Sequence, residues 1–325
     1  MNFCIFGGGS IGGLLAAGLK KIGVEVTVVA RGAQMEAIQK DGLRIIKADG
    51  EHETCQLECT DDTKSLGEQD FLFLTIKSPA LLPSLDKICP LVGKNTTVIT
   101  CMNGIPHWYF HKIGNKFENS KIKSLDPNNI IDKVISPEKI VGAVVYPAST
   151  IVEPGIIRHI SGNRFSLGEP SGLSTERLNY LSNNLKIAGF KAPMQKNIRD
   201  EIWLKLIGNL SFNPISALTG ATLEEICNNE GTEKIVREMM SEAKIIAEKL
   251  GARISISLDK RIDGARKVGA HKTSMLQDIE ARKPIEIDSI LFAVRELGEL
   301  TEVNTPQIDT ILSLISQKAQ LLNCL

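Results

Sequence analysis

The sequence has no excess of charge of either sign and no long apolar run. It contains 38 Lys and Arg residues and 38 Asp and Glu residues, so its formal net charge is zero. A neutral chain lacks the positive field with which proteins bind nucleic acids or anionic membrane surfaces. Its most apolar stretches, 11–19 and 71–76, are much shorter than the roughly 18 residues that a membrane span needs. We therefore expect neither a nucleic acid nor a membrane as a partner.

The cysteines are too scattered to form a disulfide framework or a metal site. Seven are present between Cys4 and Cys324, and only Cys55 and Cys59 are close in sequence. This single pair has no second ligand pair to complete a zinc site. An odd number of dispersed cysteines is typical of reduced thiols in the cytoplasm. No positive charge precedes Lys20, unlike in a secretory signal peptide, so we expect a cytoplasmic protein that begins with its mature N-terminus.

The first half of the chain alternates strand and helix patterns. Short apolar strands are predicted near 2–6, 24–30, 71–76 and 97–101. Alternation of this kind is typical of βαβ units and a parallel sheet. Between 140 and 167, short strands interrupted by Pro-Gly and Ser-Gly pairs predict antiparallel edge strands. The predicted fold class is therefore α/β in this half.

The second half is predicted to be helical, and a domain boundary is expected just before a long helix that begins around Ile198. We predict an α/β nucleotide-binding domain over residues 1–195 and an all-helical substrate domain over residues 196–325. Residues 233–250 carry an apolar stripe of helical period. Residues 111–132 are rich in Lys and Asn and are predicted to be a surface insertion between sheet elements.

A glycine-rich loop follows the first predicted strand and opens a helix. Its residues are Gly7, Gly8, Gly9, Ser10, Ile11 and Gly12. In such a loop the first glycine makes a tight turn, the second lets the backbone approach a pyrophosphate, and the third lets helix and strand pack closely. The amides at the helix start then bind phosphate. The strand–loop–helix context favours a Rossmann-type dinucleotide site at these six residues over a turn without a ligand.

The end of the second predicted strand indicates which dinucleotide binds. An NAD site normally has Asp or Glu at this place, where it holds the ribose hydroxyls. Here Arg31 follows Ala30 at the end of the strand, and the first acidic residue after the strand is Glu36. The planar guanidinium of arginine suits a 2′-phosphate. A solvated surface arginine is the alternative, but the sequence favours NADP(H), with NADPH as the reductant.

Polar residues recur on one face of a strongly apolar segment in the second half. Lys205, Asn209 and Asn213 are spaced four residues apart and therefore share one helix face. Their neighbours are apolar almost all round, which indicates a buried helix. A buried ammonium needs a partner or an anionic ligand. It can also protonate a carbonyl oxygen as a hydride arrives, although a structural salt bridge is the alternative.

Further motifs are Thr75-Ile76-Lys77, Asn103-Gly104, Ser274-Met275-Leu276-Gln277-Asp278 and Glu286-Ile287-Asp288. Together with the glycine loop, Arg31 and the Lys205 helix, and in this chain order, they resemble the ketopantoate reductase family. The resemblance implies a Rossmann domain joined to a helical domain. It also implies an NADPH-dependent oxidoreductase that reduces ketopantoate to pantoate in pantothenate biosynthesis.

The resemblance assigns roles to individual residues. Lys205 corresponds to the catalytic lysine that donates a proton to the substrate oxygen, and Glu286 to a second catalytic residue, a carboxylate close to it. Asn103 corresponds to an asparagine near both nicotinamide and substrate, and Lys77 to a residue beside the cofactor. The implied substrate-binding residues also include Asn209, Asn213 and Ser274. An ionised Glu286 would keep Lys205 protonated, although a first-turn helix charge is an alternative role.

Several positions depart from the family pattern. Leu291 and Phe292 stand where an Asn-Gly pair is typical, and His271 stands where a substrate-binding Asn is found. Residues 107–132 form an insertion that begins with the aromatic cluster His107-Trp108-Tyr109-Phe110. The cluster is also consistent with ordinary packing, and the sequence leaves open whether the insertion forms a lid. These departures leave another 2-oxo acid as an alternative to ketopantoate. The oligomeric state is also open, with a homodimer as one alternative.

Two other kinds of function fit part of the pattern. One is an opine-type or 3-hydroxyacid dehydrogenase, and the other is an NADP-sensing binding protein without turnover. The joint presence of Lys205, Asn209 and Glu286 argues against the sensor. The expected function is NADPH-dependent reduction of a small 2-oxo acid to a 2-hydroxy acid, with ketopantoate as the first candidate.

Overall fold

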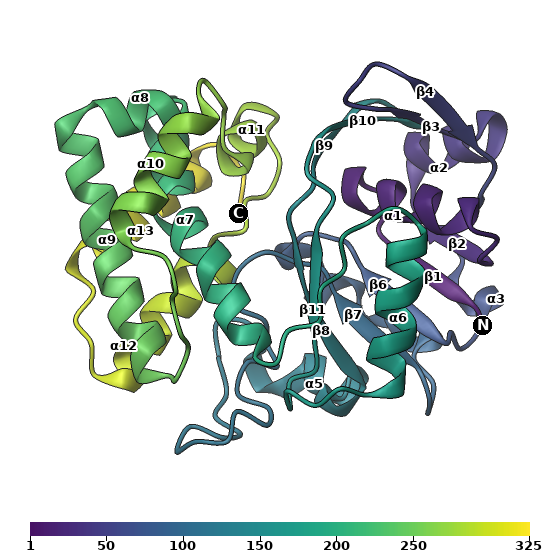
Figure 1. The fold of residues 1–325 in the computed structure, drawn as a ribbon, viewed down its shortest axis with the longest axis horizontal. Helices are drawn as coiled ribbons and strands as arrows, with labels where there is room; N and C mark the ends of the chain where they lie inside the picture. Colours follow the sequence, from purple (N-terminus) through teal and green to yellow (C-terminus); the bar gives the residue numbers. More distant parts are fainter. The chain divides into compact units, whose positions relative to one another are not determined.

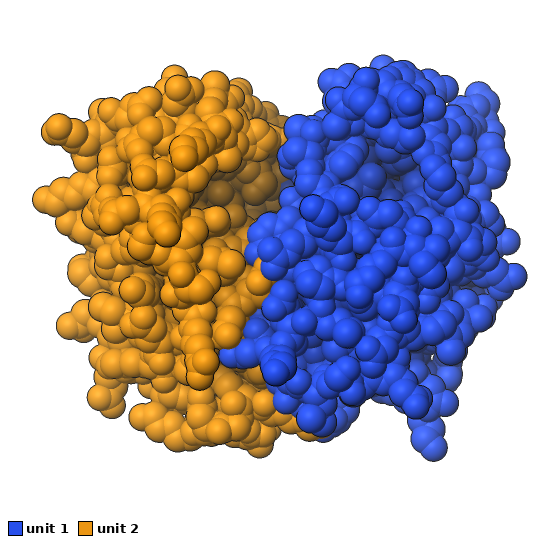
Figure 2. Space-filling view, viewed as in Figure 1, with its two compact units in different colours: residues 1–102, 129–198 blue, residues 103–128, 199–325 orange.

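The computed structural model describes residues 1–325 and divides into two compact units. Unit 1 comprises residues 1–102 and 129–198, and unit 2 comprises residues 103–128 and 199–325 (Figure 2). The predicted division kept all of residues 1–195 together. In the structure, residues 103–128 instead group with the helical unit, because their aromatic side chains are buried in its core.

Unit 1 contains a seven-stranded sheet with the order β11-β8-β7-β6-β1-β2-β5 (Figure 1). Its strands are β1 (Phe3–Phe6), β2 (Val26–Val29), β5 (Glu58–Thr60), β6 (Phe71–Leu74), β7 (Thr97–Thr100), β8 (Ile140–Val145) and β11 (Phe165–Gly168). All neighbours are parallel except β11, which pairs antiparallel with β8 at one edge. Central strands of this sheet are buried along their whole length, as expected when helices cover both faces. The sheet confirms the predicted fold class.

A second, four-stranded sheet in unit 1 has the order β4-β3-β10-β9. Its strands are β3 (Leu43–Ile46), β4 (His52–Cys55), β9 (Ala148–Glu153) and β10 (Ile156–Ser161). The strands predicted between 140 and 167 divide between the two sheets: β8 and β11 pair antiparallel in the main sheet, and β9 and β10 belong to this one. In the smaller sheet β10 pairs in parallel with β3, and its Ile157 packs onto Gly13, where a side chain would leave no room.

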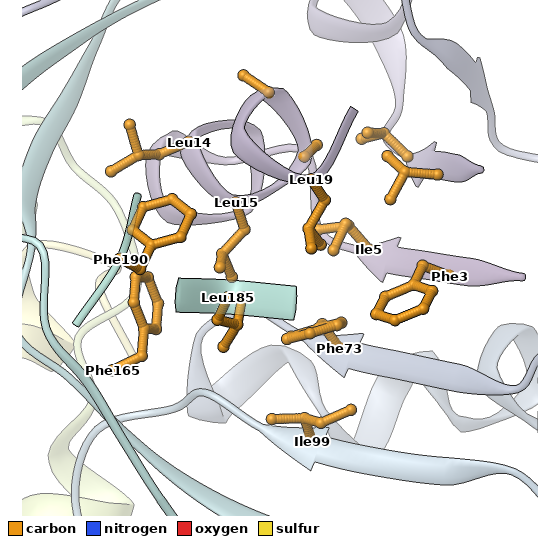
Figure 3. Packing of buried hydrophobic residues seen from close by; sticks show 14 of the residues in the cluster. Phe3, Ile5, Leu14, Leu15, Leu19, Phe73, Ile99, Phe165, Leu185 and Phe190 are labelled. Atoms are coloured by element: carbon orange, nitrogen blue, oxygen red, sulfur yellow. The ribbon is translucent and has the colours of Figure 1, made fainter. Parts of the chain in front are cut away.

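Helices and side chains on both sides of the main sheet bury the core of unit 1. The helices are α1 (Ser10–Lys21), α2 (Gly32–Asp41), α3 (Thr63–Leu66), α4 (Leu85–Ile88), α5 (Ile130–Val134) and α6 (Glu176–Ile187), with short 3₁₀ turns at Ser78–Ala80, Leu82–Ser84, Cys89–Leu91, Pro127–Asn129 and Pro137–Lys139. Figure 3 shows Leu15 and Leu19 of α1 above Ile5 and Phe73 of the central strands. This packing holds the start of α1 at the end of β1.

Unit 2 is a bundle of helices. They are α7 (Ile198–Thr219), α8 (Leu223–Asn228), α9 (Glu230–Lys249), α10 (Leu258–Val268), α11 (Ser274–Glu280), a π-helical turn (Asp288–Phe292), α12 (Ala293–Thr301) and α13 (Pro306–Leu321) (Figure 1). The stripe predicted in α9 is buried, including Val236, Met239, Met240 and Ala243. No helix of the chain combines the length and apolar character that crossing a membrane requires.

Residues 103–128 are held to unit 2, rather than to the sheet domain, by specific contacts, although many of residues 111–128 are exposed. The Trp203 Nε1 donates a hydrogen bond to the Tyr109 Oη at 2.7 Å, and both rings are fully buried. The Arg199 guanidinium donates to the Tyr109 carbonyl oxygen at 2.7 Å. Further along, the backbone amides of Lys123 and Ser124 both donate to the Glu296 carboxylate. The aromatic cluster therefore serves packing within the helical unit.

Burial of Tyr109 has a consequence for stability at high pH. Burial raises the pKa of its phenol from 10.0 to about 12, although the hydrogen bond from Trp203 opposes this shift. Between these two values the unfolded chain loses the phenolic proton while the folded chain keeps it. Stability therefore falls as pH rises from 10 towards 12, by up to about 1.4 kcal/mol per pH unit for one proton.

Ultraviolet absorbance of the phenolate measures this shift directly. We expect a late ionisation step that Tyr109→Phe removes. Tyr180→Phe is the matched control because Tyr180 is 38% exposed. A late step that persists in Tyr109→Phe would contradict the assignment.

Candidate active site

Helix α7 carries the polar face predicted from the sequence. Lys205 and Asn209 are half-buried, and Asn213 is buried. The rest of this part of the helix is anchored by apolar side chains, of which Trp203 and Leu210 are fully buried. Packing on the other faces therefore fixes the helix and aligns the three polar side chains along one side.

A chain of hydrogen bonds joins three of the predicted site residues. Lys205 Nζ donates to Asn103 Oδ1 at 2.7 Å, and Asn103 Nδ2 donates to Glu286 Oε2 at 2.8 Å. The amide of Asn103 thus turns its oxygen to the ammonium and its nitrogen to the carboxylate. Charge-assisted hydrogen bonds of this kind are stronger than neutral ones and polarise one another. The arrangement couples Glu286, which is only 6% exposed, to Lys205.

The backbone around Asn103 is held by the turn that follows Glu286. The Ile105 amide donates to the Ser289 carbonyl oxygen at 2.8 Å. Gly104 has a φ of +87°, and a side chain there would collide with the backbone of Ser289. Only glycine permits this close approach without strain. Sequence reasoning did not identify Ser289 as a positioning residue, and a contact through a backbone carbonyl leaves no signal in the sequence.

Two of the family departures lie in this same turn. Leu291 is fully buried, so it belongs to the core of unit 2. Phe292 is half-buried, and the Arg295 guanidinium lies 5.2 Å from its ring centre. The turn from Asp288 to Phe292 is π-helical, and such widened turns are frequent at functional sites.

The remaining predicted substrate residues lie around α7 and α11. Asn213 Nδ2 donates a long hydrogen bond of 3.4 Å to Ser274 Oγ, and Ser274 is the exposed first residue of α11. Asn209 lies between Lys205 and Asn213 on the α7 face. His271 is half-buried in the loop before α11. Unit 2 therefore brings together an ammonium, a carboxylate, three amides and a hydroxyl.

The glycine loop in unit 1 is a tight turn that leads directly into α1. Gly7 has a φ of +122°, and a side chain on Gly12 would collide with the Gly7 carbonyl oxygen, which accepts a hydrogen bond from Thr75 Oγ1 at 2.8 Å. A side chain at Gly9 would point into open space. Gly9 caps α1 without a side-chain hydrogen bond, and the first turn of this 12-residue helix has no acid. These amides fit an anionic phosphate.

The predicted cofactor-binding groups of unit 1, which are one loop and two residues, follow three adjacent parallel strands. The glycine loop follows β1, Arg31 comes shortly after β2, and Lys77 comes shortly after β6. Because β6, β1 and β2 are neighbours, these positions share the carboxyl edge of the sheet, where dinucleotides bind in this type of fold. Arg31 is exposed at the start of α2, and no acidic residue lies in the first turn of that helix.

Gly8 has a packing role at this edge. A side chain on Gly8 would meet the Cβ of Ala30 at 2.7 Å, so the loop can lie directly against the end of β2 only if this residue is glycine. The Gly8 carbonyl oxygen accepts a hydrogen bond from Gln34 Nε2 at 2.9 Å. Ser10 and Ile11 form the first turn of α1, where their amides face the uncapped helix end.

Comparisons with known proteins agree over the whole chain. Residues 3–172 match the family model described as ketopantoate reductase PanE/ApbA, and residues 197–319 match the model of its C-terminal part. A 2-dehydropantoate 2-reductase of Mesorhizobium japonicum is 49% identical over 320 residues, which cover 98% of each chain.

Solved structures resemble the whole chain as well. A crystal structure from Ralstonia solanacearum, described as a candidate ketopantoate reductase, is 38% identical with a TM-score of 0.95 and covers 100% of this chain and 99% of its own. A D-mandelate dehydrogenase solved with NADH and anilino(oxo)acetate has a TM-score of 0.85 at 22% identity, with 100% of each chain covered. At that identity the similarity shows a common fold alone.

Proposed function

Because this chain belongs to the ketopantoate reductase family, we propose that it reduces a small 2-oxo acid to a 2-hydroxy acid with NADPH, with ketopantoate as the first substrate to test. The hydrogen-bonded series Lys205–Asn103–Glu286 carries the proposal. A proton donor must hold its proton until the substrate oxygen becomes negative. An ionised Glu286, linked through the Asn103 amide, favours the protonated state of Lys205.

The proposed division of labour follows from these residues. When bound, NADPH supplies the hydride for the carbonyl carbon. Lys205 donates a hydrogen bond to the carbonyl oxygen and transfers a proton to it as negative charge develops there. One hydride and one proton together convert the carbonyl to an alcohol. Asn209, Asn213 and Ser274 supply hydrogen-bonding groups that orient the substrate on the α7 face.

The glycine loop, Arg31, Lys77 and Asn103 are the residues that we propose to hold NADPH. Gly7, Gly8, Gly9, Ser10, Ile11 and Gly12 would receive the pyrophosphate, and Arg31 the 2′-phosphate. The open space at Gly9 and the uncapped start of α1 support the first role. Exposure of Arg31 beside an acid-free helix start supports the second.

Arg31→Ala tests the cofactor preference. The loss of a charge-assisted contact to phosphate is expected to raise the KM for NADPH about tenfold to a hundredfold. NADH has no 2′-phosphate, so its KM should change little. Arg44→Ala is a matched control, because Arg44 is an exposed arginine of unit 1 outside the dinucleotide edge. An unchanged ratio of the two KM values would contradict the phosphate role.

The initial rate of NADPH oxidation tests the proposed function itself. Ketopantoate should be compared with pyruvate, 2-oxoisovalerate, oxaloacetate and an aromatic 2-oxo acid, each with NADPH and with NADH. A kcat/KM for ketopantoate of about 10⁴ M⁻¹s⁻¹ or above would support a place in pantothenate biosynthesis. A high rate with another 2-oxo acid would support the alternative suggested by His271, Leu291 and Phe292.

Failure to reduce any 2-oxo acid while NADPH still binds would contradict the proposed function and favour a nucleotide-sensing protein. The cytoplasm stays the predicted compartment. A homodimer stays one alternative for the assembly, which light scattering of the purified protein would decide.

A further inference from the structure

A half-buried arginine that was not among the predicted site residues lies against helix α7 within one turn of Lys205. Arg261 belongs to α10, and its guanidinium packs directly over Gly208 of α7. A side chain on Gly208 would collide with Nη2 of Arg261 and lie only 3.0 Å from both Cζ and Nε. The guanidinium therefore occupies the place of the missing side chain.

Gly208 adjoins Lys205 on the surface of α7. It is three residues after Lys205, and residues three apart in a helix are neighbours, whereas Asn209 and Asn213 lie further round the helix. At a rise of about 1.5 Å per residue, Lys205 and Gly208 are separated by about 4.5 Å along the axis. The structure thus places a guanidinium beside the helix position from which Lys205 extends.

The separation of about 4.5 Å between these two helix positions is comparable with the size of a 2-oxo acid. In every such substrate the carboxylate is bonded directly to the carbonyl carbon, so an ammonium at the carbonyl oxygen leaves the carboxylate within a few ångströms. A guanidinium binds a carboxylate through two parallel hydrogen bonds, which an ammonium cannot do. A glycine within an otherwise apolar helix costs helix stability, and here it makes room for the arginine.

We propose that Arg261 binds the carboxylate of the 2-oxo acid and that Gly208 makes this contact geometrically accessible. The inference rests on the proposed function, because it assigns a substrate group to the same site. In this arrangement Lys205 donates a hydrogen bond to the carbonyl oxygen and Arg261 binds the carboxylate. Arg261 is then a substrate-binding residue that selects 2-oxo acids over neutral carbonyl compounds.

Comparison of an acid with its ester tests this proposal. We would measure kcat/KM for the best 2-oxo acid and for its methyl ester, in the wild type and in Arg261→Ala. The variant is expected to lose about tenfold to a hundredfold in kcat/KM with the acid, mainly through KM. It should lose little with the ester, and the KM for NADPH should stay unchanged. A variant that loses equally with both substrates, or with neither, would overturn the proposal.

Three further variants separate substrate binding from a structural role. Gly208→Ala should reproduce the selective loss because its methyl group displaces the guanidinium, while alanine favours the helix more than glycine does. Arg261→Lys keeps the positive charge but loses the planar pair of hydrogen-bond donors, so its affinity for the acid should lie between those of Arg261→Ala and the wild type. Lys260→Ala, which removes an exposed cation of the same helix, is the control and should leave the ratio of acid to ester unchanged.

A binding measurement distinguishes failure of this inference from failure of the proposed function. Pantoate and the 2-hydroxy acids that correspond to the other tested substrates would be titrated calorimetrically into the wild type and Arg261→Ala, both saturated with NADP⁺. Weaker binding to the variant of an acid that binds the wild type supports the carboxylate contact even if no 2-oxo acid is reduced. Equal binding of that acid to both proteins would overturn it whatever the turnover.

Discussion

Replacement of Lys205 by alanine is expected to lower kcat for the 2-oxo acid by about 10²-fold or more, the usual scale for loss of a general acid. The ammonium lies 2.7 Å from Asn103 Oδ1 and is coupled through that amide to the Glu286 carboxylate. Without it, no side chain in this series can donate a proton to the carbonyl oxygen. The negative charge that develops on this oxygen would then be stabilised only by hydrogen bonds from neutral amides of α7.

Steady-state kinetics of Lys205→Ala separate this role from a structural one. The KM for NADPH should change little, since the glycine loop and Arg31 are unaltered. Lys234→Ala is the matched control, because Lys234 is an exposed lysine of the same unit at 76% side-chain exposure. Retention of kcat in Lys205→Ala would contradict the general-acid assignment, and equal losses in both variants would point to a nonspecific effect of charge.

Trp203→Ala is expected to have the largest effect on stability, a loss of about 3–5 kcal/mol in the free energy of unfolding. The indole is fully buried in α7 and packs edge-on to Tyr109, with ring centres 6.5 Å apart. It also donates a hydrogen bond to the Tyr109 hydroxyl. Truncation would leave a cavity and a buried phenol without this donor, at the point where residues 103–128 join the helical unit.

Chemical denaturation of the full chain measures this effect. Trp203→Phe is the matched control, because it keeps most of the ring volume and loses only the indole donor, so its loss should be clearly smaller. The alanine variant should also weaken protection of the 103–128 amides against hydrogen exchange. A change within about 0.5 kcal/mol, the range of ordinary surface substitutions, would show that Trp203 does not anchor this segment.

Periodicity and local motifs explain which parts of the site could be predicted. The spacing of Lys205, Asn209 and Asn213 identifies a helix face because helical geometry acts over a few residues. The glycine loop is equally local, since its turn, its helix start and its strand are contiguous. The same reasoning assigned residues 111–132 to the sheet domain as a surface insertion. Many of these residues are exposed, but residues 103–128 group with the helical unit, through partners distant in sequence such as Glu296 and Arg199.

The sequence by itself determined the α/β and helical halves, the glycine turn between β1 and α1, and the polar face of α7, because each depends on neighbours within a few residues. Only the tertiary structure placed the Asn103 amide between Lys205 and Glu286, and the Arg261 guanidinium over Gly208. These groups come from segments that are separated along the chain and meet only when the helices of unit 2 pack. Such contacts depend on the packing of whole elements, and a single sequence carries no periodic signal for them.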